Sequence, residues 1–171
     1  MARTYRAQSE KSTIDKAMQS FAQTRLGGLL FVTVIPAIDR RVMGITGGRV
    51  KVAMGQPVLL LHARGAKTGT PRVTPLLYTP HGEELVLVAS KAGAQHHPAW
   101  YHNLRAHPDV EVELDGERMP VCAHEAEGAE REELWRLVND NYNGYGVYQT
   151  RAGGRRIPIM VLTPVSAPPA T

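Results

Sequence analysis

The sequence contains a single cysteine, Cys122, in 171 residues. One thiol excludes an internal disulfide and any metal site built from several cysteines, so we expect a reducing compartment such as the cytoplasm. No signal-peptide pattern precedes the first apolar run. That run, residues 26–38, is too short to span a bilayer, which needs about 20 apolar residues. Internal repeats are also absent, and we expect one main folded body.

Familiar catalytic motifs are missing as well. Lys67-Thr68-Gly69 matches one motif of the penicillin-recognising serine enzymes, but the accompanying Ser-x-x-Lys does not occur. The Gly-x-Ser-x-Gly motif of the serine hydrolases is absent too. Four histidines crowd residues 96–107 without an acid at matching spacing, so we expect no metal site.

Positive charge is concentrated in the first third of the chain. Residues 1–51 carry nine lysines and arginines against three acids, whereas the remaining residues carry eleven against thirteen. A slightly acidic body argues against nucleic-acid binding. The basic, apolar segment 1–51 predicts helices and a linker that either pack on the core or contact a membrane surface. Residues 52–165 are expected to form the folded domain, and residues 166–171 a disordered tail.

Apolar patterns in the body predict mainly strands. The predicted strands cover residues 58–63, 72–78, 84–90, 110–114, 118–123 and 157–162, and the predicted helices cover residues 98–105 and 129–141. Short connections, such as Asp115-Gly116, favour an α+β fold with an antiparallel sheet or small barrel and attached helices. We expect the third strand to lie beside the second in a meander.

The most distinctive stretch joins the first two predicted strands. Arg64, Lys67 and Arg72 lie in a turn with two glycines and a proline, and no acid interrupts them. A stiff cationic turn at a strand end is suited to binding an anion. An ordinary solvated hairpin loop explains the same composition equally well.

Further along the chain, three groups of side chains complement this turn. They are Ser90-Lys91, the segment from Pro98 through Trp100 to Asn103, and Tyr142, Tyr145 and Tyr148 at every third residue. Cations, an indole and a tyrosine row together suit a flat, polyanionic cofactor. Taken singly, Trp100 is better explained as a core residue and the tyrosines as an amphipathic helix face than as parts of a cofactor site.

Several of these motifs together resemble the deazaflavin-dependent nitroreductases of actinobacteria. The matching segments are Lys67-Thr68-Gly69-Thr70-Pro71-Arg72, Pro75-Leu76, Ala89-Ser90-Lys91, His97-Pro98-Ala99-Trp100-Tyr101-His102-Asn103-Leu104 and Tyr142…Tyr145…Tyr148-Gln149. They occur in the family's order and spacing from about Pro57 to Val165. The resemblance implies a split β-barrel that binds coenzyme F420, an 8-hydroxy-5-deazaflavin.

The resemblance also implies roles for individual residues. Lys67, Thr68 and Arg72 would hold the phosphate and oligoglutamate tail, with Gly69 in the same turn. The remaining cofactor-binding positions are Pro75, Leu76, Ser90, Lys91, Ala99, Trp100, Tyr101 and Asn103. Tyr145 would stand near the deazaflavin ring, and Leu77, Tyr142 and Tyr148 would form the walls of the substrate pocket. Ser90 and Tyr145 are the catalytic candidates, as hydrogen-bond donors to the acceptor.

The implied reaction is hydride transfer from reduced F420 to a quinone, an enone or a nitro-aromatic compound. A homodimer and a peripheral contact with the inner face of the plasma membrane are compatible with the resemblance. Two positions depart from the family: Ala66 stands where relatives often carry arginine, and Leu77 replaces a tyrosine of the nitroimidazole pocket. The alternatives are a split-barrel enzyme that uses FMN or haem, and a module that binds the coenzyme or a lipid without turnover.

Overall fold

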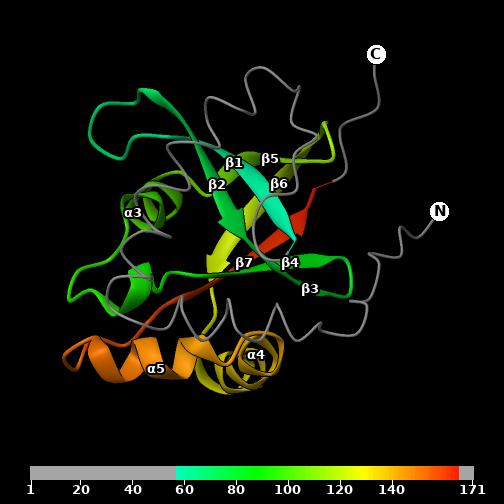
Figure 1. Cartoon of the computed structure of the whole chain (residues 1–171). Helices are drawn as coiled ribbons and strands as arrows, with labels where there is room; N and C mark the ends of the chain where they lie inside the picture. The colour runs from blue at the N-terminus through cyan, green and yellow to red at the C-terminus, as the bar shows by residue number, and fades with distance from the viewer. Residues whose placement is uncertain (1–56, 166–171) are drawn as a thin grey trace, which may run out of the picture.

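A computed structural model describes residues 57–165 of the chain (Figure 1). The expectations for a basic helical segment with membrane-surface contact, for the linker and for the tail 166–171 concern residues outside this range. Between residues 57 and 165, no helix has the length and apolar character needed to cross a membrane.

The described range contains seven strands, three α-helices and a short 3-10 segment, η1. The strands are β1 (Val58–Arg64), β2 (Pro71–Leu77), β3 (Thr79–His81), β4 (Glu84–Val88), β5 (Asp109–Leu114), β6 (Glu117–Glu125) and β7 (Ile159–Pro164). The helical segments are η1 (Lys91–Gly93), α3 (Ala99–Ala106), α4 (Gly128–Asn141) and α5 (Gly144–Arg151). Each strand and helix predicted from the body sequence is present, with bounds that differ by at most two residues.

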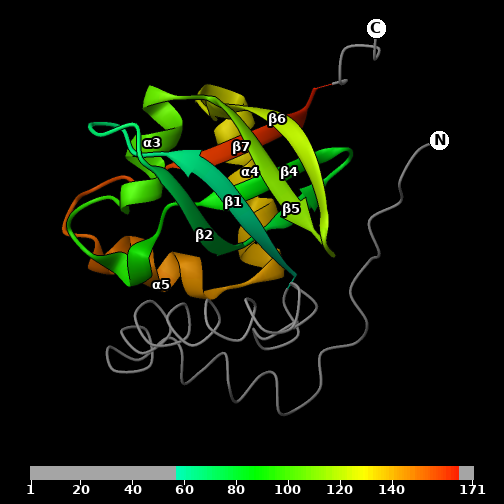
Figure 2. The same cartoon turned by 90° about the horizontal axis from the view of Figure 1, so that it is seen from above.

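All seven strands belong to one antiparallel sheet in the order β2-β1-β5-β6-β7-β4-β3. The sheet curls into a half-barrel, so that β2 approaches β4 although no ladder joins them (Figure 2). The predicted split barrel of mainly antiparallel strands with flanking helices is confirmed. Pro75 belongs to β2, which ends the sheet order, and an edge strand is where a sheet tolerates proline.

The predicted meander is wrong. The strand expected beside β2 is β4, and it pairs instead with β3 and β7. Strand β3 was missed because three residues, one of them Pro80, are too few to show a periodic pattern. This short strand turns the chain back on β4, and the buried strand β7 occupies the other edge of β4.

Side chains alternate between two apolar cores on the two faces of the sheet. In β4, Leu85 and Leu87 join the core that contains Trp100, Tyr101 and Leu104 of α3, whereas Val86 joins the core under α4 and α5. This alternation follows from the two-residue period of a strand. The sheet is therefore covered by α3 on one face and by α4 and α5 on the other (Figure 1).

Candidate functional site

The turn between β1 and β2, helix α3, η1 and α5 follow one another down the same side of the half-barrel, and both views show this (Figures 1 and 2). These four segments carry most of the site residues predicted from the sequence. Specific contacts join them in pairs: α3 to the turn, and η1 to α5.

The basic turn, residues 64–72, is held by its own backbone. The Gly65 amide donates to the carbonyl of Thr70 at 2.9 Å, and the Gly69 amide donates to the carbonyl of Gly65 at 2.8 Å. Gly69 has a φ of +64°, a left-handed conformation that glycine adopts without strain. The turn therefore keeps its shape while it exposes the side chains of Lys67, Thr68 and Arg72.

The cations of this turn have no acidic partner among the described residues. Arg64, Lys67 and Arg72 are exposed, and none of them forms an ion pair with a described acid. Their charges are therefore available to an anion. Because the three side chains share one short turn, an anion bound there would meet several positive charges.

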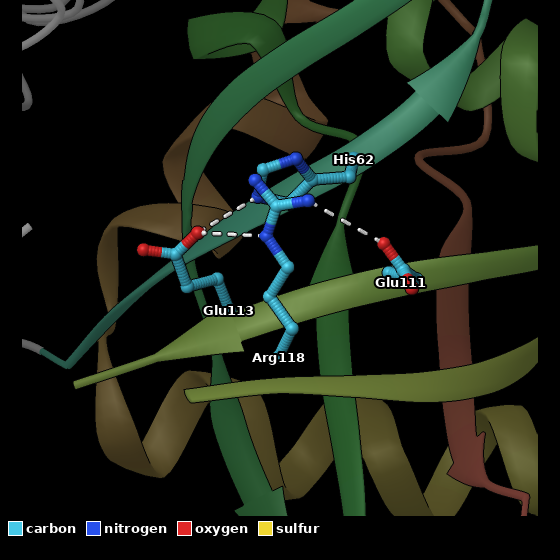
Figure 3. A network of polar contacts seen from close by, with 4 residues as sticks. All are labelled: His62, Glu111, Glu113 and Arg118. Carbon is cyan, nitrogen blue, oxygen red and sulfur yellow. Dashed lines mark hydrogen bonds and ion pairs between the residues drawn. The ribbon is translucent and has the colours of Figure 1, made fainter. Parts of the chain in front are cut away.

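Two acids of β5, the strand that pairs with β1, are bound to other side chains (Figure 3). Glu113 on β5 accepts from His62 Nε2 at 3.1 Å and from Arg118 Nε at 3.3 Å. Glu111 lies 3.7 Å from the guanidinium of Arg118. His62 belongs to the face of β1 opposite to Leu61 and Ala63, which point into the core around α3.

Asn103 connects the basic turn to helix α3. Its Oδ1 accepts a hydrogen bond from the backbone amide of Ala66 at 2.9 Å, across 37 residues of sequence. Ala99 is exposed at the start of α3, and Asn103 is half-buried one turn later. The contact fixes the turn relative to the one face of α3 that remains open.

Trp100 and Tyr101 point the other way. Both lie in the apolar core under α3, and only 8% and 5% of their surfaces remain exposed. The Tyr101 hydroxyl donates to Glu125 on β6 at 2.8 Å, and burial together with this carboxylate raises the pKa of Tyr101. These two residues anchor the helix.

Ser90 and Lys91 lie at the start of a tight loop after β4. Lys91, Ala92 and Gly93 all have positive φ, at 48°, 52° and 82°. The Lys91 ammonium donates to Nε2 of His96 at 2.6 Å, so that nitrogen is unprotonated. Gly93 packs so closely on α5 that a Cβ there would lie 2.8 Å from the carbonyl oxygen of Tyr148.

The three tyrosines form one buried group. Tyr145 and Tyr148 belong to α5, whereas Tyr142 immediately follows α4, and the ring centroids are 5.1 to 6.4 Å apart. The hydroxyls of Tyr142 and Tyr148 hydrogen-bond each other at 3.0 Å. Burial raises the pKa of all three phenols. No hydrogen bond of the Tyr145 hydroxyl is found within residues 57–165.

The pairing of β2 with β1 separates the remaining predicted residues. Leu76 lies opposite Leu59 and packs against the core around α3, whereas Pro75 and Leu77 lie opposite Leu60 and Val58. Successive residues of a strand point to opposite faces, so Leu76 lies on one face of the sheet and Pro75 and Leu77 on the other.

One feature of the described residues was not predicted from the motifs. Arg155 donates to three carbonyls and one imidazole of the loop that follows β4, and nothing in local periodicity singles it out. Its position after Gly153-Gly154, just before a buried strand, was the only available signal. No group of three His, Cys, Asp or Glu residues able to hold a metal ion occurs within the described part of the chain.

Comparison with known proteins gives consistent matches. The family model described as F420H(2)-dependent quinone reductase matches residues 35–164. An F420H(2)-dependent quinone reductase of Mycobacterium tuberculosis is 42% identical over 142 residues, which cover 80% of this chain and 91% of that protein.

Solved structures agree with the sequence matches. One described as an F420-H2 dependent reductase (FDR-A) has a TM-score of 0.56 and 38% identity, over 62% of this chain and 93% of that one. Another, described as a domain-swapped dimer, has a TM-score of 0.59 and 33% identity, over 73% of this chain and 96% of that one. The resemblance inferred from the motifs is confirmed, and the chain belongs to the F420H(2)-dependent quinone reductase family.

Proposed function

We propose that this protein is an oxidoreductase that transfers a hydride from reduced coenzyme F420 to an electron-poor acceptor, with quinones as the first acceptor class. The family membership supports the coenzyme and the quinone. The structural observation that carries the proposal is the group of unpaired cations in the basic turn. Enones and nitro-aromatic compounds are further acceptors to test.

The donor set of the turn fits the charge of this coenzyme. F420 carries a phosphate and an oligoglutamate tail, and both are anionic. Lys67 and Arg72 would bind these anions, Thr68 would add a hydroxyl, and the left-handed Gly69 keeps the turn narrow. Lys91, whose ammonium donates to a histidine nitrogen and pairs with no described acid, would add a further positive charge from η1.

Two kinds of contribution are proposed for α3 and β2. The exposure of Ala99 and the partial exposure of Asn103 support direct contact with the coenzyme. Trp100 and Tyr101 would contribute by fixing the helix, because little of either side chain is exposed. Leu76 and Pro75 are half-buried on opposite faces of β2. The coenzyme would therefore contact both residues only if it lay across the free edge of this strand.

The coenzyme would supply the hydride, and the protein would position the two reactants and exclude water. Tyr145 would donate a hydrogen bond to the acceptor. Its raised pKa keeps the phenol protonated at neutral pH, and its hydroxyl has no partner among the described residues. Ser90 is the second proposed donor. Leu77, Tyr142 and Tyr148 are proposed to shape the pocket, the two tyrosines by packing against Tyr145.

Coenzyme titration with full-length protein tests the proposal. We expect micromolar-range binding of F420, weakened about tenfold or more by Lys67→Ala, because a charge-assisted contact contributes about 1.5–3 kcal/mol. Arg118→Ala is the control, since that arginine already pairs with two acids of β5. Tight binding of FMN or haem in place of F420 would refute the assignment of the cofactor.

Turnover separates an enzyme from a binding module. We expect the purified protein to oxidise reduced F420 in the presence of menadione, followed by the absorbance of the oxidised deazaflavin. If the protein binds F420 but oxidises reduced F420 with no quinone, enone or nitro-aromatic compound, the alternative of a binding module without turnover is supported.

The membrane hypothesis for residues 1–51 stays a prediction, and sedimentation with anionic liposomes at low salt tests it. The homodimer is tested by the mass of the protein in solution.

A further inference from the structure

Arg155, in the segment between α5 and β7, binds the loop formed by residues 89–97. Its Nε donates to the carbonyl of Ala94 at 2.8 Å, and its Nη2 donates to the carbonyl of Ser90 at 2.8 Å. Its Nη1 is shared between the carbonyl of Ala89, at 3.2 Å, and Nδ1 of His97, at 3.0 Å. One planar guanidinium thus reaches both ends and the middle of the loop.

The arginine is itself fixed by the end of α5. The side-chain amide of Gln149 donates to the carbonyl of Arg155 at 2.8 Å, while its Oε1 accepts from the amide of Ile157 at 2.9 Å. This bridge ties the backbone at Arg155 and at Ile157 to helix α5. The helix also carries Tyr145, so the arginine sets the loop relative to the proposed hydrogen-bond donor.

No described acid neutralises this guanidinium. Arg155 is absent from the ion pairs of residues 57–165, and its acceptors are neutral carbonyls and an imidazole. The loop that it holds contains left-handed Lys91 and Ala92, a backbone conformation that is sterically unfavourable for residues other than glycine. The arginine therefore stabilises a loop conformation that the loop's own sequence disfavours.

The contact with His97 also determines where the imidazole carries its proton. A guanidinium can only donate, so Nδ1 must accept and the proton lies on Nε2. Burial, followed by the positive charges of Arg155 and His102, lowers the pKa of His97; Arg105 adds to this effect, and Glu125 on β6 opposes it. The ring packs against Tyr101 at 4.7 Å, and Nε2 has no hydrogen-bond partner within the described residues.

We propose that Arg155 is a positioning residue of the coenzyme site: it fixes the loop 89–97 that presents Ser90 and Lys91, and it holds His97 as a neutral donor with Nε2–H available to the bound coenzyme. This inference rests on the proposed function for the identity of the ligand. The predicted tautomer of His97 and its neutral form do not depend on any ligand.

The state of His97 is measured by long-range ¹H–¹⁵N NMR on the full-length, coenzyme-free protein. In the unaltered protein at pH 7.5 we expect unprotonated Nδ1 and protonated Nε2. In Arg155→Met we expect the two tautomers to mix and His97 to titrate at a higher pH. Arg156→Met, a change at the exposed neighbouring arginine, is the matched control and should leave His97 unchanged. Protonated Nδ1 in the unaltered protein would overturn the proposal.

The second readout is the dissociation constant of F420 for the same proteins. We expect Arg155→Met to raise it about tenfold or more and Arg155→Lys to raise it less, because a lysine keeps the charge but cannot reach all four acceptors. His97→Asn retains an acceptor for Arg155 and lacks the distal N–H, so the affinity should fall while the melting temperature is kept.

Unchanged affinity in either Arg155→Met or His97→Asn would overturn the proposal. If Arg155→Met does not fold, the dissociation constants of F420 for Arg155→Lys and His97→Asn test the proposal instead, and unchanged values would overturn it. A purely structural arginine would lower the melting temperature and leave both the His97 tautomer of the folded fraction and the affinity as they were. Failure of the proposed function is a different result, since the unaltered protein would then bind no F420.

Discussion

Gly93 lies where η1 packs on α5, and replacing it tests the geometry of the proposed site. Its φ is +82°, and an added Cβ would lie 2.8 Å from both the Cβ of Arg151 and the carbonyl oxygen of Tyr148. Both distances are below the 3.0 Å that real Cβ atoms essentially never cross. One of the two neighbours is backbone, so relief requires η1 and α5 to separate.

The magnitude follows from two contributions. A left-handed conformation costs alanine about 1–2 kcal/mol, and overpacking a tight contact costs about 1–3 kcal/mol. We therefore expect Gly93→Ala to lower the free energy of unfolding by about 2–5 kcal/mol. Gly116 is the matched control, because its φ is +86° and nothing lies within 4 Å of its added Cβ. Gly116→Ala should cost only the first contribution, about 1–2 kcal/mol.

Urea unfolding followed by circular dichroism gives both free energies, and F420 titration gives the functional consequence. Gly93→Ala should also weaken coenzyme binding, since Ser90 and Lys91 are displaced together with η1, whereas Gly116→Ala should not. If Gly93→Ala costs no more than Gly116→Ala, η1 is not packed on α5 in solution. The proposed alignment of Ser90 with Tyr145 would then be wrong.

Three further predictions concern contacts elsewhere in the fold. Glu113→Ala removes the carboxylate shared by His62 and Arg118 and should lower the free energy of unfolding by about 1 kcal/mol. Glu111 is exposed, so Glu111→Ala should change this free energy by less than about 0.5 kcal/mol. Equal losses of the two variants in urea unfolding would contradict the network of Figure 3. Tyr142→Phe breaks the buried hydrogen bond with the Tyr148 hydroxyl and should lower the free energy of unfolding by about 1 kcal/mol. Tyr145→Phe should keep the free energy of unfolding and reduce turnover. If Tyr145→Phe instead lowers stability and keeps turnover, Tyr145 is structural. The pKa of His97 is lowered in the folded state, so folding favours the neutral imidazole. Its contribution to the free energy of unfolding is therefore fully present above the unfolded pKa of about 6.5 and is lost as the pH falls through the folded pKa. His97→Asn should therefore narrow the difference in stability between pH 7.5 and pH 5.5. An unchanged difference would show that burial and the charges of Arg155, His102 and Arg105 do not outweigh Glu125, which favours the charged form.

Much of the fold could be predicted from the sequence because its signals are local. Asp115-Gly116 defines the β5–β6 hairpin, and the apolar run after Pro57 gives β1. The prediction failed where pairing depends on distant segments. β4 pairs with β7, which follows it by more than seventy residues, and no pattern inside β4 names that partner.

The candidate site, too, was predicted from the sequence only where its signals are local. Most of the residues that the motifs selected lie along one side of the half-barrel, and the matched segments identified the family. They could not distinguish exposed Ala99 from buried Trp100, because both belong to the same motif and burial depends on how α3 is oriented against the sheet. They also missed Arg155, whose role consists entirely of contacts with residues about sixty positions earlier.

The sequence by itself determined the chemistry available: three cations in a glycine-constrained turn, a single thiol, and the motif series of one family. The basic turn could equally have been a solvated loop at that level. Only the tertiary structure decided that its cations have no partner among the described acids, that Asn103 fixes the turn to α3, and that Arg155 holds the loop after β4. The physical reason is that charge and conformational freedom belong to individual residues, whereas ion pairing, burial and hydrogen bonding depend on which distant residues the folded chain brings together.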